Sequence, residues 1–197
     1  LVDSIQAGLR AHGCLSIVAY PGFEKLPAPD METYSKALNA GQYPMSVLAM
    51  NHRAAELYRA GIYCNSRTAI PRAMVIAATV LRQLTPALRQ NIRDRGAEFV
   101  AALQKLADRM PGRITKVQGT GLLFSCEVSS EYRAYGANSL EEYLRLHGIG
   151  VIHGGENSLR FTPHFAIGGE ELALVVEAVA DALENGPRRE LPRAEAL

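Results

Sequence analysis

The chain has 197 residues, of which 48% are hydrophobic and 21% are charged, a composition typical of a globular protein that folds around its own core. Its 21 basic residues nearly balance its 20 acidic residues, so the net charge of +1 provides no strong field for holding a nucleic acid. No apolar run approaches the roughly 18 residues that a membrane-spanning helix needs, so we expect neither a nucleic-acid partner nor a membrane.

Short apolar runs separated by turn residues fill the first part of the chain. The runs are residues 1–5, 15–20, 31–36 and 45–50. Because each run is almost continuously apolar, the pattern predicts buried strands that helices cover on both faces, as in an α/β sheet. The segments between the runs are rich in glycine and proline, which predicts loops.

A helical pattern replaces the strand pattern at Pro71, because apolar residues then recur at three- and four-residue spacing. The two segments with this pattern are residues 71–84 and 86–110. Pro71 and Pro86 suit the first turn of a helix, and Thr85 suits a helix N-cap. We expect a domain boundary at this break, which gives domains at residues 1–85 and 86–197.

The rest of the chain mixes strand and helix patterns. Strand patterns occupy residues 114–128, 149–155 and 157–163, and helix patterns occupy residues 139–148 and 168–183. Early acidic residues in the last segment suit a helix N-terminus. The sequence therefore predicts an α+β arrangement for this second part.

Three cysteines, Cys14, Cys64 and Cys126, lie far apart and form no C-x-x-C pair. An odd number of scattered cysteines is not typical of a zinc cluster or of a disulfide scaffold. The N-terminus also lacks a basic region followed by a continuous apolar stretch. We therefore expect no metal site, no export and a reducing, cytoplasmic location.

Three charged residues are candidates for a functional site. Lys36 ends an apolar run and precedes a loop whose small residues let another group approach the backbone, although a solvated surface lysine would look the same. Asp3 follows two apolar residues and would lie at the end of a buried strand, where ligand sites of open α/β sheets gather, but a turn aspartate also fits. Arg160 lies between apolar residues, so its guanidinium requires an anionic partner, either a substrate carboxylate or a structural glutamate.

Four segments follow one another in a recognisable order along the chain. They read LVDSIQAG, YSKALNAGQYP, VQGTGLLFSCEV and LRFTP. Together they resemble the class III aminotransferases, which are fold-type I enzymes that use pyridoxal phosphate, and the resemblance runs from Leu1 to about Leu183. It implies an α/β fold: residues 1–85 would be the C-terminal part of a large cofactor-binding domain with a mixed or parallel sheet, and residues 86–197 a small α+β domain.

The resemblance implies roles in binding pyridoxal phosphate. Lys36 matches the lysine that forms a Schiff base with the cofactor aldehyde. Asp3 matches the aspartate that faces the pyridine nitrogen and keeps it protonated. Ile5 matches the apolar residue on one face of the ring, and Gln6 matches the amide near the ring hydroxyl; alternation along a strand would give these two side chains different facings.

The resemblance also implies a substrate contact and a subunit contact. Arg160 matches the arginine that pairs with the carboxylate of an amino-acid substrate. Ser66 matches the hydroxyl residue that reaches the cofactor phosphate of the neighbouring subunit, so a homodimer is expected.

The chain departs from the family pattern at several positions. Ser4 stands where the family usually has a glutamate, and Cys64 and Ile70 replace residues of the segment that reaches the phosphate. The glycine-rich phosphate loop, which in the family precedes the aspartate strand, is not among these residues. We therefore expect the chain by itself to bind the cofactor weakly and to turn over little.

The resemblance implies transfer of an amino group from an amino acid or amine to a 2-oxo acid through Lys36. Relatives of the same fold include racemases, decarboxylases and an aminomutase, so these reactions remain open. A third alternative is a noncatalytic remnant, or one subunit of a split enzyme whose partner holds the missing part.

Overall fold

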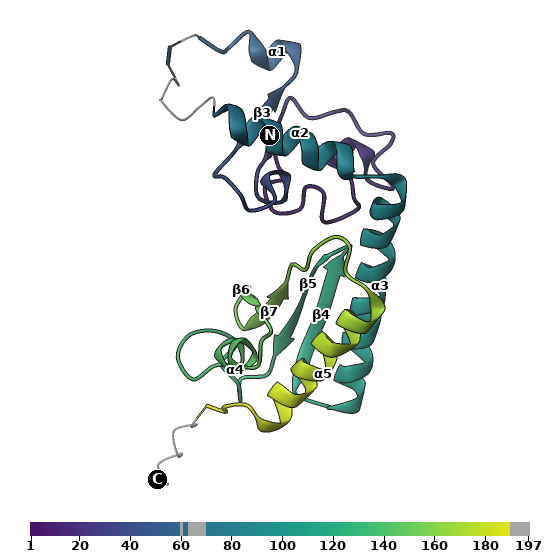
Figure 1. Cartoon of the computed structure of the whole chain (residues 1–197), viewed down its shortest axis with the longest axis vertical. Helices are drawn as coiled ribbons and strands as arrows, with labels where there is room; N and C mark the ends of the chain where they lie inside the picture. Colours follow the sequence, from purple (N-terminus) through teal and green to yellow (C-terminus); the bar gives the residue numbers. More distant parts are fainter. Residues whose placement is uncertain (60, 63–69, 190–197) are drawn as a thin grey trace. The chain divides into compact units, whose positions relative to one another are not determined.

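The computed structural model describes residues 1–59, 61–62 and 70–189 of the chain (Figure 1). The chain divides into two compact units, Leu1–Gln90 and Asn91–Leu197, and each unit has its own sheet. Strands and helices occur in both, which confirms the α/β fold class that the sequence predicts. None of the described helices is both long enough and apolar enough to cross a membrane.

The described part of the first unit contains a three-stranded sheet in the order β1-β2-β3. β1 (Val2–Asp3) pairs in parallel with β2 (Met31–Tyr34), and β2 pairs antiparallel with β3 (Val47–Met50). These strands fall within the first, third and fourth of the apolar runs, so the strand predictions for those runs are confirmed.

The prediction of a strand at residues 15–20 is wrong. A 3-10 helix, η1 (Ile17–Ala19), occupies this segment. The hydroxyl of Ser16 caps it by accepting a hydrogen bond from the backbone N–H of Val18 at 3.3 Å. The N–H of Ile17 donates to the carboxylate of Glu32 at 3.0 Å. Because side chains take these backbone donors, the segment forms a local turn in place of a sheet ladder.

The prediction that helices cover both faces of every strand is wrong for β3. All four residues of β3 are exposed, and Leu48 is 47% exposed, so the described residues bury neither face of this strand. The residues of β2 alternate: Glu32 and Tyr34 are buried, whereas Met31 and Thr33 are half-buried. The buried side of this sheet is therefore the side on which Glu32 and Tyr34 lie.

The predicted helices are present on either side of the proline break. The described α-helices up to this point are α1 (His52–Ala55), α2 (Pro71–Gln83) and α3 (Pro86–Arg109). Thr85 caps α3 as predicted, because its hydroxyl accepts a hydrogen bond from the N–H of Leu88 at 3.2 Å. α2 packs against a 3-10 helix, η2 (Lys36–Asn39), and buries the small side chains of Ala73 and Ala77.

The described part of the second unit contains a four-stranded antiparallel sheet in the order β4-β5-β7-β6. The strands are β4 (Ile114–Thr120), β5 (Leu123–Val128), β6 (Ile152–Gly154) and β7 (Ser158–Phe161). The helices are α4 (Leu140–Leu146) and α5 (Gly169–Asn185), and these elements confirm the predictions for this part of the sequence (Figure 1). The rings of Phe99, Phe124 and Phe161 stack with centroid distances of 4.4 and 5.2 Å, which joins α3 to the sheet.

Candidate functional site

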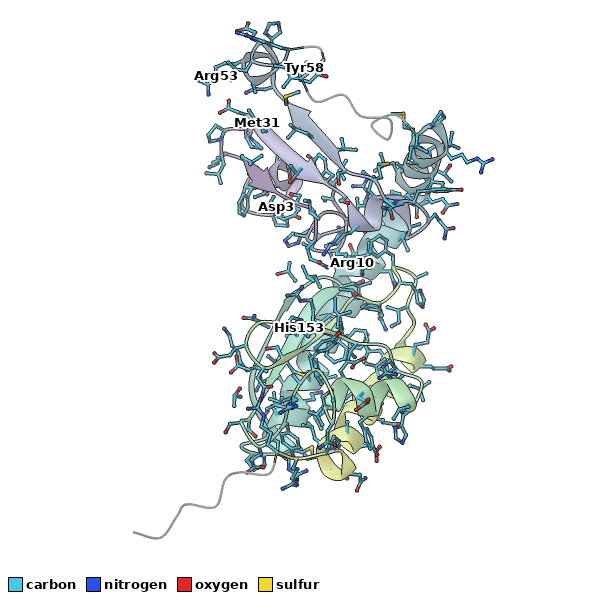
Figure 2. The ribbon with its side chains drawn as sticks, turned by 90° about the vertical axis from the view of Figure 1, so that its left-hand side faces the viewer. Asp3, Arg10, Met31, Arg53, Tyr58 and His153 are labelled. Atoms are coloured by element: carbon cyan, nitrogen blue, oxygen red, sulfur yellow. The ribbon has the colours of Figure 1, made fainter. Side chains whose placement is uncertain are left out.

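The candidate site lies where β1 and β2 end. The two strands run in parallel with Asp3 opposite Thr33, and the N–H of Ser4 donates to the carbonyl of Thr33 at 3.0 Å. Asp3 is labelled at this strand end in Figure 2. The chain therefore leaves both strands at the same edge of the sheet, and in open α/β sheets this carboxyl-end edge is where ligand sites form. The segments that follow carry Gln6 and Lys36.

Lys36 lies just beyond β2 and begins η2. Its φ is 42°, a left-handed conformation that is uncommon for a residue with a side chain, and this angle ends the extended backbone before residue 36. The side chain is exposed, and Nζ donates a hydrogen bond to Oε1 of Gln6. This hydrogen bond brings the segment after β2 to the segment after β1.

Asp3 is the last residue of β1, as predicted, but its side chain is exposed, whereas a buried strand end was expected. Oδ1 accepts a hydrogen bond from the backbone N–H of Ile5 at 2.9 Å, which turns the chain directly after the strand. Oδ2 has no hydrogen bond or ion pair within the part of the chain that the structure describes. Asp3 thus forms a turn with one oxygen and leaves the other open to a ligand.

Ile5 and Gln6 lie in a turn, so the strand alternation expected for them does not apply. The reason is the Asp3 side chain, which takes the N–H of Ile5 that a sheet ladder would need. Both side chains are half-buried. The orientation of Gln6 is set by its hydrogen bond from Lys36.

Glu32 is a buried acidic residue that the sequence reasoning missed. It lies in β2 opposite Val2 and is 3% exposed. Oε1 accepts hydrogen bonds from the Ser4 hydroxyl at 2.5 Å and from the Ile17 N–H at 3.0 Å, and Oε2 accepts one from the Ser16 hydroxyl at 2.6 Å. The available signal was a carboxylate as the single charged residue among Met31–Tyr34, together with the serine at position 4, where the family pattern usually has a glutamate.

The hydrogen bonds decide the charge state of Glu32. Burial alone would raise the pKa of this carboxyl, because the charged form loses its hydration. The donors Ser16, Ser4, Ile17 and Tyr34 outweigh burial, and the pKa lies below its ordinary value. The Glu32 carboxylate is therefore anionic at neutral pH.

Arg160 lies in β7 of the second unit, between the buried residues Leu159 and Phe161. Because neighbouring side chains of a strand point to opposite faces, the guanidinium lies on the face away from these core residues, not toward the core. It covers Gly154 of β6, where a Cβ would overlap Nε of Arg160. Among the described residues no carboxylate pairs with Arg160, so the alternative of a structural glutamate partner finds no support there.

The structure brings together part of the predicted residue set. Lys36 and Gln6 are in contact, and Asp3 and Ile5 share the turn that leads to Gln6. Arg160 belongs to the other unit. The predicted phosphate residue Ser66 and its neighbour Cys64 lie outside the described residues.

Comparisons with known proteins identify relatives of this architecture. The acetylornithine aminotransferase of Xylella fastidiosa (strain Temecula1) is 28% identical over 174 residues, which cover 88% of this chain and 41% of that protein. The solved Plasmodium falciparum ornithine delta-aminotransferase matches with a TM-score of 0.78 and 24% identity over 92% of this chain and 45% of its own. A Toxoplasma gondii ornithine aminotransferase structure, which has partial occupancy of PLP at its active site, matches with a TM-score of 0.76 and 25% identity over 92% of this chain and 42% of its own.

The chain thus spans less than half the length of these relatives. Within that span the match is continuous, because the family model for class III aminotransferases covers residues 1–183. The chain belongs to the class III aminotransferase family.

Proposed function

We propose that the protein is a pyridoxal-phosphate-dependent aminotransferase that moves an amino group between an amino acid or amine and a 2-oxo acid. The observation that carries this proposal is the contact of Lys36 with Gln6 beside Asp3, at the shared carboxyl end of β1 and β2. Family membership supports the same reaction.

The residues present fit pyridoxal phosphate. Lys36 presents an exposed primary amine, the group that an aldehyde requires. Asp3 presents an exposed carboxylate with an open Oδ2, the acceptor that a protonated pyridine nitrogen requires. Ile5 offers an apolar side chain and Gln6 an amide in the same turn.

Each residue would perform a distinct task. The cofactor supplies an electron-accepting ring that stabilises the charge left when the Cα–H bond of the substrate breaks. Asp3 would hold the proton on the ring nitrogen, and Lys36 would move the proton at the substrate Cα. Arg160, which has no anionic partner among the described residues, would bind the substrate carboxylate with its planar fork.

The two units would correspond to parts of the family's two domains. We assign residues 1–85 to the large cofactor-binding domain and residues 86–197 to the small domain. The exposure of all four residues of β3 supports the first assignment, since a sheet with uncovered faces requires additional cover in a complete domain. The relatives, more than twice as long as the aligned segment, contain sequence that can supply it.

The quaternary structure and location follow from the same proposal. The protein would be a homodimer in which Ser66 reaches the cofactor phosphate of the neighbouring subunit, and it would act in the cytoplasm. Sedimentation of the protein with cofactor measures whether it is a dimer. Ser66→Ala should weaken cofactor binding without changing the oligomeric state.

A half-reaction tests the proposed chemistry. The chain is incubated at substrate-level concentration with excess cofactor and an amino acid, and the 2-oxo acid released is measured together with the chirality of the remaining amino acid. Because the chain by itself should bind the cofactor weakly, we expect slow release of a small amount of 2-oxo acid, none with Lys36→Ala, and the same slow release with the control Lys25→Ala. Racemised or decarboxylated amino acid without 2-oxo acid would assign another reaction, and no product at all would favour the noncatalytic alternative.

A further inference from the structure

Glu32 joins three segments of the first unit through a single buried carboxylate. Its hydrogen bonds reach Ser4 at the end of β1 and both Ser16 and Ile17 at the start of η1, while Glu32 itself belongs to β2. No lysine, arginine or histidine pairs with this carboxylate in the described ranges. A buried charge without a counter-ion is unfavourable unless hydrogen bonds compensate it, and here the donors of Ser4, Ser16 and Ile17 provide that compensation.

The network acts on the two residues that matter most for the proposed chemistry. Ser4 follows Asp3 directly, and Lys36 lies one short segment beyond Glu32 on the same chain. Ser4 is buried and Asp3 is exposed, as expected for neighbours in an extended backbone that point to opposite sides. A hydrogen bond that holds Ser4 inward therefore holds the Asp3 carboxylate outward.

The sequence departure at position 4 supports this assignment. The family pattern usually has a glutamate there, whereas this chain has Ser4. In the structure a carboxylate nevertheless accepts a hydrogen bond from that position, and it comes from the adjacent strand. In this chain a carboxylate therefore links the end of β1 to β2 through position 4.

We infer that Glu32 is a positioning residue, which through Ser4 fixes the end of β1 against β2 and thereby sets Asp3 relative to Lys36. This inference rests on the proposed function, because its consequence is the selective reaction of Lys36 with pyridoxal phosphate. The role is geometric: the carboxylate is needed as an acceptor for Ser4.

The test compares reductive trapping of pyridoxal phosphate at Lys36 with trapping at Lys25 in the same folded sample, by peptide mass mapping after borohydride. Glu32→Ala and Ser4→Ala should each lower the Lys36-to-Lys25 ratio by about tenfold or more, because a misplacement of about 1 Å in a reacting group can cost up to about a hundredfold. Glu56→Ala and Ser46→Ala, exposed positions of the same unit, are the matched controls and should leave the ratio unchanged.

Glu32→Gln shows whether the effect of Glu32 on the trapping ratio comes from its hydrogen bonds or from its negative charge. Its amide oxygen can still accept from Ser4 and Ile17, and its amide nitrogen can donate to the Ser16 hydroxyl, so the ratio should stay within about threefold of the wild type. A loss as large as that of Glu32→Ala would contradict a geometric role. Circular dichroism verifies the fold of each variant, and where Glu32→Ala does not fold, Ser4→Ala decides.

The outcomes distinguish this inference from the proposed function. If trapping is selective for Lys36 in the wild type and stays selective in a folded Ser4→Ala or Glu32→Ala variant, the role of Glu32 is overturned and the proposed function stands. Equal trapping at Lys36 and Lys25 in the wild type overturns the proposed function and this inference with it.

Discussion

Lys36 donates a hydrogen bond from Nζ to Oε1 of Gln6, and this contact links the segments that follow two parallel strands. The two residues are far apart in the sequence, and the parallel pairing of β1 with β2 is what brings them together. An amine and an amide at the carboxyl end of a sheet are placed where a ligand can reach both.

Replacement of Gln6 tests that contact. Gln6→Ala removes the acceptor for Nζ of Lys36 and should lower the free energy of unfolding by less than about 1 kcal/mol, because an exposed hydrogen bond exchanges with water. Urea denaturation measures this change, and trapping of cofactor at Lys36 should fall a few-fold. Gln42→Ala, an exposed glutamine of the loop after η2, is the control and should leave trapping unchanged. An equal effect of both variants would contradict a specific role for Gln6.

Glu32 should give the protein a distinct loss of stability in acid. The folded-state pKa lies below the ordinary value of 4.5, because the hydrogen-bond donors outweigh burial. The resulting stabilisation is fully present above pH 4.5 and is lost as the pH falls through the lower, folded-state pKa. The free energy of unfolding of the wild type minus that of Glu32→Gln should therefore be constant from pH 7 to 5 and decrease toward pH 3. A difference that does not change with pH would show that Glu32 is not anionic in the folded state.

Gly154 should control the position of the Arg160 guanidinium. Gly154→Ala places a Cβ where Nε of Arg160 lies, and the flexible arginine side chain is the part that must move. We expect faster modification of Arg160 by phenylglyoxal, read by peptide mapping, and a stability change of less than about 1 kcal/mol. Gly150→Ala is the matched control, since a Cβ there meets open space. Unchanged modification of Arg160 would contradict this packing.

Gly96 permits close contact between α3 and the turn from β4 to β5. A Cβ at Gly96 would overlap the carbonyl oxygen of Gly121, and neither backbone can yield easily. Gly96→Ala should therefore destabilise the protein by about 1–3 kcal/mol, although alanine ordinarily stabilises a helix relative to glycine. Thermal or urea unfolding measures the effect, with the exposed neighbour Ala97→Ser as control. A more stable Gly96→Ala variant would contradict the contact.

Local signals in the sequence predicted the elements whose causes are themselves local. Thr85 and Pro86 mark the start of α3, where the Thr85 hydroxyl accepts a hydrogen bond from the N–H of Leu88 at 3.2 Å. These features act within one turn of helix, so a window of a few residues contains them.

The failed predictions depend on partners that are distant in the sequence. Residues 15–20 form no strand because Ile17 donates to Glu32, 15 residues away. Glu32 was missed because its links to Ser4 and Ser16 span 28 and 16 residues. The exposure of β3 depends on what packs over its two faces, which the apolar pattern of the strand does not report.

The candidate site was predictable only in part. The order of short runs and turns placed Lys36 and Asp3 each at a strand end, but it did not show that the two strands are neighbours. The assignment of these residues to pyridoxal phosphate came from the family resemblance. The turn at Ile5 was not predictable from the sequence, because it depends on the conformation of the Asp3 side chain. The hydrogen bond from Lys36 to Gln6 was not predictable either, because it depends on the parallel register of β1 and β2.

The central claim is that Lys36 is the lysine that binds the cofactor aldehyde. The most direct measurement treats the folded chain with pyridoxal phosphate, reduces the adduct with borohydride and maps the modified peptides. The account predicts modification concentrated on Lys36, with little on Lys25, Lys105 or Lys116. Modification spread evenly over these lysines, or concentrated on one of the other three, would contradict it.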